Sequence, residues 1–182
     1  YKVTVTGGPN FAYQLCVERV DGAHAEGLDL SCLKVAFCGA EPIQARTLEQ
    51  FSSRFAHTGF RSEAVFPCYG LAESTLFVAG GHLDQPQSVL SVDRAELAKG
   101  VIRPVDARQA HSDTISRIVS CGQHALQTEV KIVDGESKQE LPEQSIGEIW
   151  IRGKSVAGGY WEKDSKATDD GLNETRDAAA NT

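Results

Sequence analysis

The sequence contains no methionine, and it also lacks the patterns of several common protein classes. No stretch approaches the ~20 apolar residues that a membrane-spanning helix needs, and the first residues do not form a secretory signal pattern. Because the chain begins in mid-pattern at YKVTVTGG without methionine, we expect it to be an internal segment of a longer protein. At roughly 100–200 residues per domain, its 182 residues form one domain or two small subdomains.

Positive charge is scarce as well. The sequence has 18 Lys and Arg residues and 25 Asp and Glu residues, which gives a formal net charge of −7. Binding to a nucleic-acid backbone needs a basic face, and no cluster of basic residues stands out. We therefore expect no nucleic-acid partner, whereas a small polyanionic ligand remains open because it needs only a few local donors.

Neither cysteine nor histidine shows the spacing of a metal site. The five cysteines are widely spaced without a C-x-x-C, and the five histidines are scattered. The cysteines are Cys16, Cys32, Cys38, Cys68 and Cys121. We expect free thiols in a reducing compartment, hence a cytoplasmic protein, and no metal held by the protein alone.

Three catalytic motifs are missing. The chain has no G-x-S-x-G of serine hydrolases and no G-x-G-x-x-G of dinucleotide-binding folds. The GKS at 153–155 does not form a phosphate-binding P-loop, because Glu148 stands where that motif requires glycine. The residues before GKS alternate like a strand instead.

The first part of the chain predicts a turn followed by a helix. GGPN, residues 7–10, has turn chemistry, and Asn10 can cap a helix that begins near Phe11 and ends at Gly22. This helix carries apolar residues on two sides, so we expect it to be well buried. GGPNFAY fits either a plain turn and cap or one wall of an apolar tunnel.

Two apolar runs, 32–40 and 63–70, predict buried strands of a parallel sheet. A helix from Pro42 to about Phe55 lies between them, and strand, helix, strand is typical of an α/β unit. The next stretch, 71–81, is compatible with a short helix or with a further strand.

The pattern changes in the second half of the chain. Between Gly81 and Ser112 the periodicity fades, apart from one short helix predicted over 92–100. Apolar and polar residues then alternate, which predicts antiparallel strands in a small barrel or curled sheet. The predicted segments are an α/β subdomain at 1–80, a loop region at 81–112, a β-subdomain at 113–161 and a polar, mobile tail at 162–182.

The loops after the two parallel strands are the candidate ligand site. Ligands of parallel sheets bind at the carboxyl ends of the strands, where CGAEPI and CYGLAES would lie side by side. Gly39 and Gly70 would let the backbone approach a flat ligand, and Tyr69 offers a ring for stacking. Glu73 is interpreted either as a carboxylate favoured at a helix start or as a ligand of Mg²⁺ on a nucleotide phosphate.

Four stretches in order carry a resemblance to a known family. They are GGPNFAYQLC, FCGAEPI, YGLAEST and GEIWIRGKSVAGGYW, with SCGQ and EVKIVD between the last two. Together they resemble the adenylate-forming superfamily and, more narrowly, the fatty acyl-AMP ligases, which carry GGPNFAY and YGLAE. The resemblance extends to Trp161.

The resemblance implies that a fatty acid reacts with ATP to give acyl-adenylate and pyrophosphate. The acyl group then passes to the phosphopantetheine thiol of an acyl carrier protein. By position, it assigns Gly39, Ala40, Glu41 and Pro42 to the adenine, Tyr69 to stacking on it, Gly70, Leu71 and Ala72 to the α-phosphate and acyl head, Glu73 to Mg²⁺ and catalysis, and Asn10, Phe11, Leu15 and Cys38 to the acyl pocket.

The family's phosphate loop, its TGD motif and its C-terminal domain with the catalytic lysine do not occur in this stretch. The chain alone is therefore expected to be inactive. Two alternatives stay open, a fragment of a long-chain acyl-CoA synthetase and a non-catalytic binding module. Ala72, which stands where many relatives have a hydroxyl, favours the ligase branch. The segment 81–112 is either an ordinary loop or the insertion that disfavours transfer to CoA in that branch.

Overall fold

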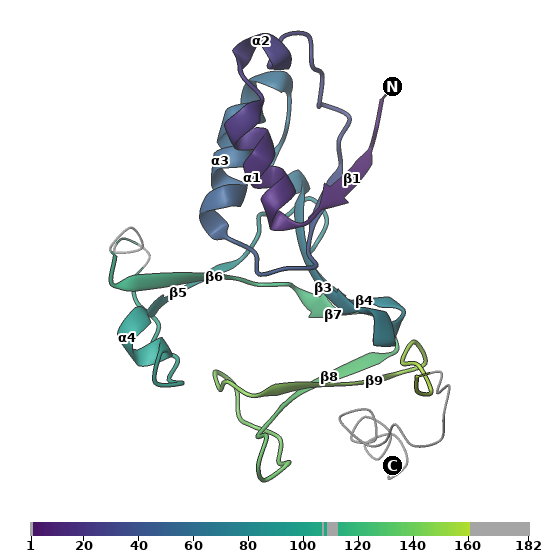
Figure 1. The fold of residues 1–182 in the computed structure, drawn as a ribbon, viewed down its shortest axis with the longest axis vertical. Coiled ribbons are helices and arrows are strands. Elements are labelled where there is room, and N and C mark those ends of the chain that lie inside the picture. The colour runs from purple at the N-terminus through teal and green to yellow at the C-terminus, as the bar shows by residue number, and fades with distance from the viewer. Residues whose placement is uncertain (1, 107, 109–112, 161–182) are drawn as a thin grey trace. The chain divides into compact units, whose positions relative to one another are not determined.

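A computed structural model describes residues 2–106, 108 and 113–160 as a mixed α/β chain (Figure 1). The elements are β1 (Val5–Gly8), α1 (Asn10–Arg19), α2 (Gly22–Ala25), β2 (Val35–Cys38), α3 (Ala45–Phe55), the 3₁₀ turns η1 (Ala56–Thr58) and η2 (Ser62–Ala64), β3 (Val65–Leu71), the 3₁₀ turn η3 (Ala72–Ser74), β4 (Leu76–Gly80), β5 (Val89–Asp93), α4 (Arg94–Leu97), β6 (Ile115–Val119), β7 (Gln123–His124), β8 (Thr128–Val133) and β9 (Glu148–Gly153). The tail predicted at 162–182 lies outside the described residues.

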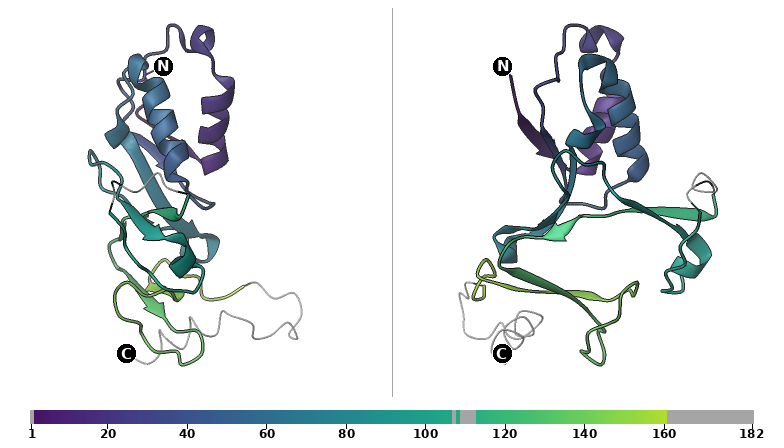
Figure 2. Two further views of the ribbon diagram at one scale, coloured as in Figure 1. Left: turned by 90° about the vertical axis from the view of Figure 1, so that its left-hand side faces the viewer. Right: turned by 180° about the vertical axis from the view of Figure 1, so that it is seen from behind.

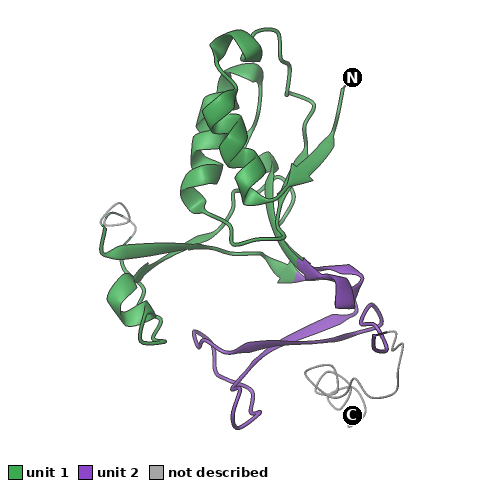
Figure 3. Ribbon diagram, viewed as in Figure 1, with its two compact units in different colours: residues 1–69, 79–123 green, residues 70–78, 124–182 purple. Residues whose placement is uncertain are grey.

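The chain divides into two compact units (Figure 3). Unit 1 comprises Tyr1–Tyr69 and Ala79–Gln123, and unit 2 comprises Gly70–Val78 and His124–Thr182. The segment boundaries drawn from the sequence at 80, 112 and 161 stay predictions.

The predicted α/β arrangement is confirmed. The strand order of the main sheet is β1-β2-β3-β4-β7, and β2 pairs in parallel with both β1 and β3. Figures 1 and 2 show α1 and α3 side by side on one face of these parallel strands. The register pairs Cys38 with Pro67, so β2 and β3 bring the residues that follow Cys38 beside those that follow Pro67.

The core of unit 1 lies between the parallel strands and these two helices. On α3, Leu48, Phe51 and Phe55 recur at helical spacing and are buried, as the sequence predicts. The Phe51 ring meets the edge of Tyr13 from α1 at a centroid distance of 4.9 Å. Aromatic packing of this kind adds to the burial of apolar area and fixes α1 against α3.

A buried hydroxyl fastens α1 to the sheet. Tyr13 is 5% exposed, and its phenol donates to the Phe37 carbonyl of β2 at 2.7 Å. Burial raises the pKa of Tyr13 well above its ordinary value, so the phenol stays a donor.

We expect Tyr13→Phe to lower the free energy of unfolding by about 0.5–1.5 kcal/mol, because it removes a buried hydrogen bond to the Phe37 carbonyl. Denaturant unfolding of the full-length protein, followed by circular dichroism, measures this change. Identical midpoints for the two proteins would show that the hydrogen bond adds no stability.

Three expectations for α1 are wrong. Asn10 does not cap the helix: Pro9 occupies the N-cap, and the Asn10 side chain accepts instead from the backbone N–H of Gln44 at 3.0 Å. The helix ends at Arg19, and Gly22 begins α2. Nor is α1 buried on two sides, since Tyr13 alone among its residues is buried.

Other boundaries also differ from the prediction. Pro42 does not lie in the first turn of α3, which begins at Ala45 after the N-cap Gln44. The helix predicted over 92–100 is only the four-residue α4, capped by the Asp93 side chain. The strand β5 before it was not predicted, and it pairs with β6 in unit 1. Residues 72–80 form the turn η3 and the strand β4.

The strand β2 has one buried face. Ala36 and Cys38 are buried under the helices, whereas Phe37 on the opposite face is 43% exposed. The continuous apolar run predicted burial on both faces, but in the described residues helices cover only one.

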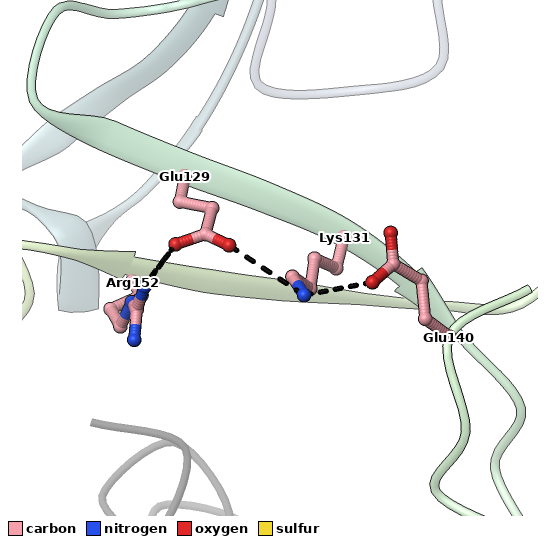
Figure 4. A network of polar contacts seen from close by, with 4 residues as sticks. All are labelled: Glu129, Lys131, Glu140 and Arg152. Carbon is pink, nitrogen blue, oxygen red and sulfur yellow. Dashed lines mark hydrogen bonds and ion pairs between the residues drawn. The ribbon is translucent and has the colours of Figure 1, made fainter. Parts of the chain in front are cut away.

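In unit 2, β8 and β9 pair in antiparallel fashion, as predicted. Burial follows the predicted alternation only in part, because Ile151 is buried whereas Ile149 is 47% exposed. The described residues form no closed barrel. A polar network covers one face of this pair (Figure 4), in which Arg152 donates to Glu129, and Lys131 lies 2.8 Å from Glu140 and 3.7 Å from Glu129. These groups are solvent-exposed, so they fix register more than they add stability.

Candidate active site

The loop after β2 approaches β3 so closely that only glycine fits at its first position. A Cβ on Gly39 would lie 2.8 Å from both the carbonyl oxygen and the Sγ of Cys68. The next residue, Ala40, has a φ of 68°, a left-handed conformation that L-residues rarely adopt. The chain therefore turns sharply at 39–40, with Gly39 buried against β3 and Ala40 exposed.

The end of β2 lies beside β3, but β3 continues to Leu71, so Tyr69 and Gly70 lie in the strand and not in the predicted loop. Gly39 packs on Cys68, the residue before Tyr69, and Tyr69 itself is half-buried. All five cysteines are free. Burial raises the pKa of Cys38 to about 12 and also raises the pKa of Cys68, so both thiols are protonated at neutral pH.

The carboxylate of Glu41 has a contact that the sequence did not predict. Its Oε1 accepts from the backbone N–H of Phe11 at 2.5 Å, in the first turn of α1. Asn10 in turn accepts from Gln44 at the start of α3. Thus a backbone amide in the first turn of α1 is bound by Glu41, which precedes α3, and the N-cap amide of α3 is bound by Asn10 of α1. The role of Glu41 beside adenine remains a prediction.

The four residues assigned to the acyl pocket differ in their exposure, and their shared role remains a prediction. Phe11 and Leu15, one helical turn apart on α1, are 57% and 43% exposed. Cys38 is fully buried in the core cluster, and the Asn10 side chain is bound to Gln44. An apolar ligand can reach Phe11 and Leu15, whereas Cys38 contributes to the core.

The second group of candidate residues, Gly70–Glu73, lies in unit 2, where β3, η3 and β4 form a tight hairpin. A Cβ on Gly70 would lie 1.6 Å from the Leu76 carbonyl oxygen. Thr75 and Leu76 have φ angles of 53° and 77°. Gly70 is therefore required by the hairpin itself, whatever ligand approaches it, while Ala72 lies exposed at the start of η3.

Glu73 presents an ionised carboxylate at the surface of unit 2. The residue is half-buried, and its Oε1 accepts a hydrogen bond from the hydroxyl of Tyr160. This hydrogen bond, with a smaller contribution from its own backbone amide, holds the pKa of Glu73 below its ordinary value. Among the described residues no Lys, Arg or His forms an ion pair with it.

These properties fit one ligand of a magnesium ion, which uses one or two carboxylates together with phosphate oxygens and water. A site made by the protein alone is absent from the described segments, where no group of three or more His, Cys, Asp or Glu residues could hold a metal. In the same segments, no helix is long and apolar enough to cross a membrane.

Sequence reasoning missed Tyr160. It belongs to the GGYW end of a stretch that carries the resemblance, yet it lies 87 residues from Glu73 in the chain. No periodicity or spacing predicts a contact between two loops so far apart in sequence.

Comparison with known proteins identifies the family. The AMP-binding enzyme family matches residues 1–161. The chain belongs to this family. The predicted resemblance to fatty acyl-AMP ligases is confirmed by the relatives that it matches.

Two relatives have the same identity to this AMP-binding chain. A medium-chain-fatty-acid–[acyl-carrier-protein] ligase, TtuA, from Teredinibacter turnerae is 39% identical over 161 residues, which are 88% of this chain and 24% of the relative. A long-chain-fatty-acid–AMP ligase, FadD32, from Mycolicibacterium smegmatis is also 39% identical over 161 residues, or 88% of this chain and 25% of the relative.

A solved structure agrees with these relatives. The fatty acyl-adenylate ligase from L. pneumophila, in complex with acyl adenylate and pyrophosphate, matches with a TM-score of 0.82 and 41% identity. The match covers 90% of this chain and 28% of that one. The AMP-binding chain therefore spans about a quarter of the length of the proteins that it matches.

Proposed function

We propose that the full-length protein containing this chain is a cytoplasmic ligase that activates a fatty acid with ATP and passes the acyl group to an acyl carrier protein. The observation that carries the proposal is the match over residues 1–161, which includes every candidate residue. The relatives' names support the substrate and the acceptor, because TtuA is named a fatty acid ligase of acyl carrier protein.

The residues of this chain would act by binding and orienting. Gly39, Ala40, Glu41 and Pro42 form the loop beside which adenine would lie, with the Tyr69 ring on its other side. Gly70, Leu71 and Ala72 would line the site of the α-phosphate and the acyl head. The exposed Phe11 and Leu15 would contact the fatty chain. Glu73 would hold Mg²⁺, which supplies positive charge to the phosphates when it is bound.

The experiment is an exchange assay on the full-length protein, which measures incorporation of labelled pyrophosphate into ATP. We expect exchange that depends on a medium- or long-chain fatty acid, because formation of acyl-adenylate is reversible. Exchange that ignores fatty acids would refute the proposal, and so would an absence of exchange under all conditions, which would favour a non-catalytic binding module.

The acceptor is tested separately. A second candidate, an acyl-CoA synthetase, is favoured by one relative, a putative fatty-acid–CoA ligase that is 37% identical over 158 residues. When CoA and phosphopantetheinylated carrier protein are offered together, we expect acylation of the carrier protein to be at least about tenfold faster. Faster formation of the CoA thioester would overturn the assignment of the acceptor.

A further inference from the structure

The loop after β9, residues 153–160, is fastened to the turn that carries Glu73. Within unit 2, the backbone N–H of Ala157 donates to the Glu73 carbonyl at 2.7 Å. The Thr75 hydroxyl donates to the Ser155 carbonyl, also at 2.7 Å. The backbone of the 153–160 loop is therefore held against the turn at two points, although the segments lie 80 residues apart in the chain.

This attachment places Tyr160 at the carboxylate. Tyr160 is 68% exposed, so its ring adds little to any apolar core. Its defined contact in the described residues is the hydrogen bond from its hydroxyl to Oε1 of Glu73. A tyrosine kept for packing would be buried, whereas this one presents its polar end to an acidic group.

The chemistry of the contact suits a carboxylate that must still bind a cation. A Lys or Arg in the same place would neutralise Glu73 and compete with a metal ion for it. A phenol orients the carboxylate while leaving its negative charge intact, as hydrogen-bonded neighbours of metal-binding carboxylates do. The free rotation of the Glu73 side chain is thereby restricted before any ligand binds.

We propose that Tyr160 is a positioning residue that orients the Glu73 carboxylate toward the Mg²⁺ of bound MgATP. The proposal rests on the function proposed above, since it requires Glu73 to contact the metal. In this proposal the 153–160 loop has a functional role, because it carries the Tyr160 hydroxyl that orients the Glu73 carboxylate.

The test is calorimetric titration of the full-length protein with MgATP, and with ATP in the presence of EDTA. We expect Tyr160→Phe to weaken MgATP binding about three- to tenfold, the size of a lost hydrogen bond to a charged group that is partly solvated. Binding of metal-free ATP should stay unchanged. The thermal midpoint of the ligand-free variant should match that of the parent, because the ring and both backbone attachments remain.

A double-mutant cycle separates positioning from a general effect on the loop. In a Glu73→Gln background, Tyr160→Phe should no longer change MgATP affinity. Equal weakening in both backgrounds, or no weakening in the parent, would overturn the proposal for Tyr160. As a matched control, Tyr13→Phe removes a tyrosine hydroxyl in unit 1 and should show no coupling to Glu73.

The cycle also tells the two proposals apart. If Glu73→Gln weakens MgATP binding while Tyr160→Phe does not, the role of Tyr160 is refuted and that of Glu73 stands. If Glu73→Gln itself leaves the difference between MgATP and metal-free ATP unchanged, the metal role of Glu73 is refuted and the inference for Tyr160 fails with it.

Discussion

Replacing Glu73 with glutamine in the full-length protein is expected to reduce fatty-acid-dependent ATP–pyrophosphate exchange by about 100-fold or more. The side chain keeps its size and can still accept from Tyr160, but it loses the charge that, in the proposed function, would bind Mg²⁺. Metal-assisted charge stabilisation is worth several kcal/mol, and each 1.36 kcal/mol corresponds to about a tenfold change in rate. The assay is initial-rate exchange at saturating ATP and fatty acid.

The chain offers a matched control for this variant. Glu143 lies in unit 2, is exposed, and has no hydrogen bond or ion pair within the described residues. Glu143→Gln makes the same chemical change and should leave exchange at the parental rate. Full exchange in Glu73→Gln would contradict a metal-binding role, and equal losses in both variants would point to a general effect of lost negative charge.

Gly70→Ala is expected to have the largest effect on folding. The added methyl group would lie 1.6 Å from the Leu76 carbonyl oxygen and 2.7 Å from its carbon. The obstacle is backbone, and it cannot rotate away as a flexible side chain can. Overpacking that forces backbone movement costs roughly 1–3 kcal/mol and occasionally more, and we expect the upper end or beyond because the hairpin is already strained at Thr75 and Leu76.

Gly158→Ala is the matched control for this substitution. Gly158 is also in unit 2, and nothing lies within 4 Å of a Cβ built on it. We expect Gly70→Ala to lower the thermal midpoint of the full-length protein strongly, or to yield no soluble protein, while Gly158→Ala expresses and unfolds as the parent does. If Gly70→Ala had the same thermal midpoint as the parent, the hairpin would have to accommodate the added methyl group without loss of stability.

The sequence predicted well those elements whose local pattern and tertiary environment agree. The helix that ends at Phe55 and the start of β3, where Val65 and Pro67 are buried, are such elements, because their apolar residues lie in the interior of unit 1. The approach of Gly39 to β3 was also predicted, since parallel strands end at the same edge of a sheet.

Contacts between distant segments set the features that were missed. Asn10 has a side chain suited to capping its own helix, yet its side-chain oxygen accepts a hydrogen bond from the backbone N–H of Gln44, 34 residues away. The strand β5 lies in a stretch without clear periodicity and is held by pairing with β6. Gly70 was interpreted as a glycine that lets a ligand approach the backbone. The structure shows that glycine is needed there because β4 passes close to it, and no local sequence pattern predicts this approach.

The bond between Glu41 and the Phe11 amide affects how variants of the nucleotide loop should be interpreted. Substituting Glu41 removes an acceptor from the first turn of α1, the helix that carries the exposed Phe11 and Leu15. A change in fatty-acid preference in a Glu41 variant would then arise from displacement of α1, with no direct encounter between that carboxylate and the lipid. If Glu41 also lies beside adenine as proposed, one substitution would change both ATP affinity and chain-length preference, and measuring both in the same Glu41 variant tests that link.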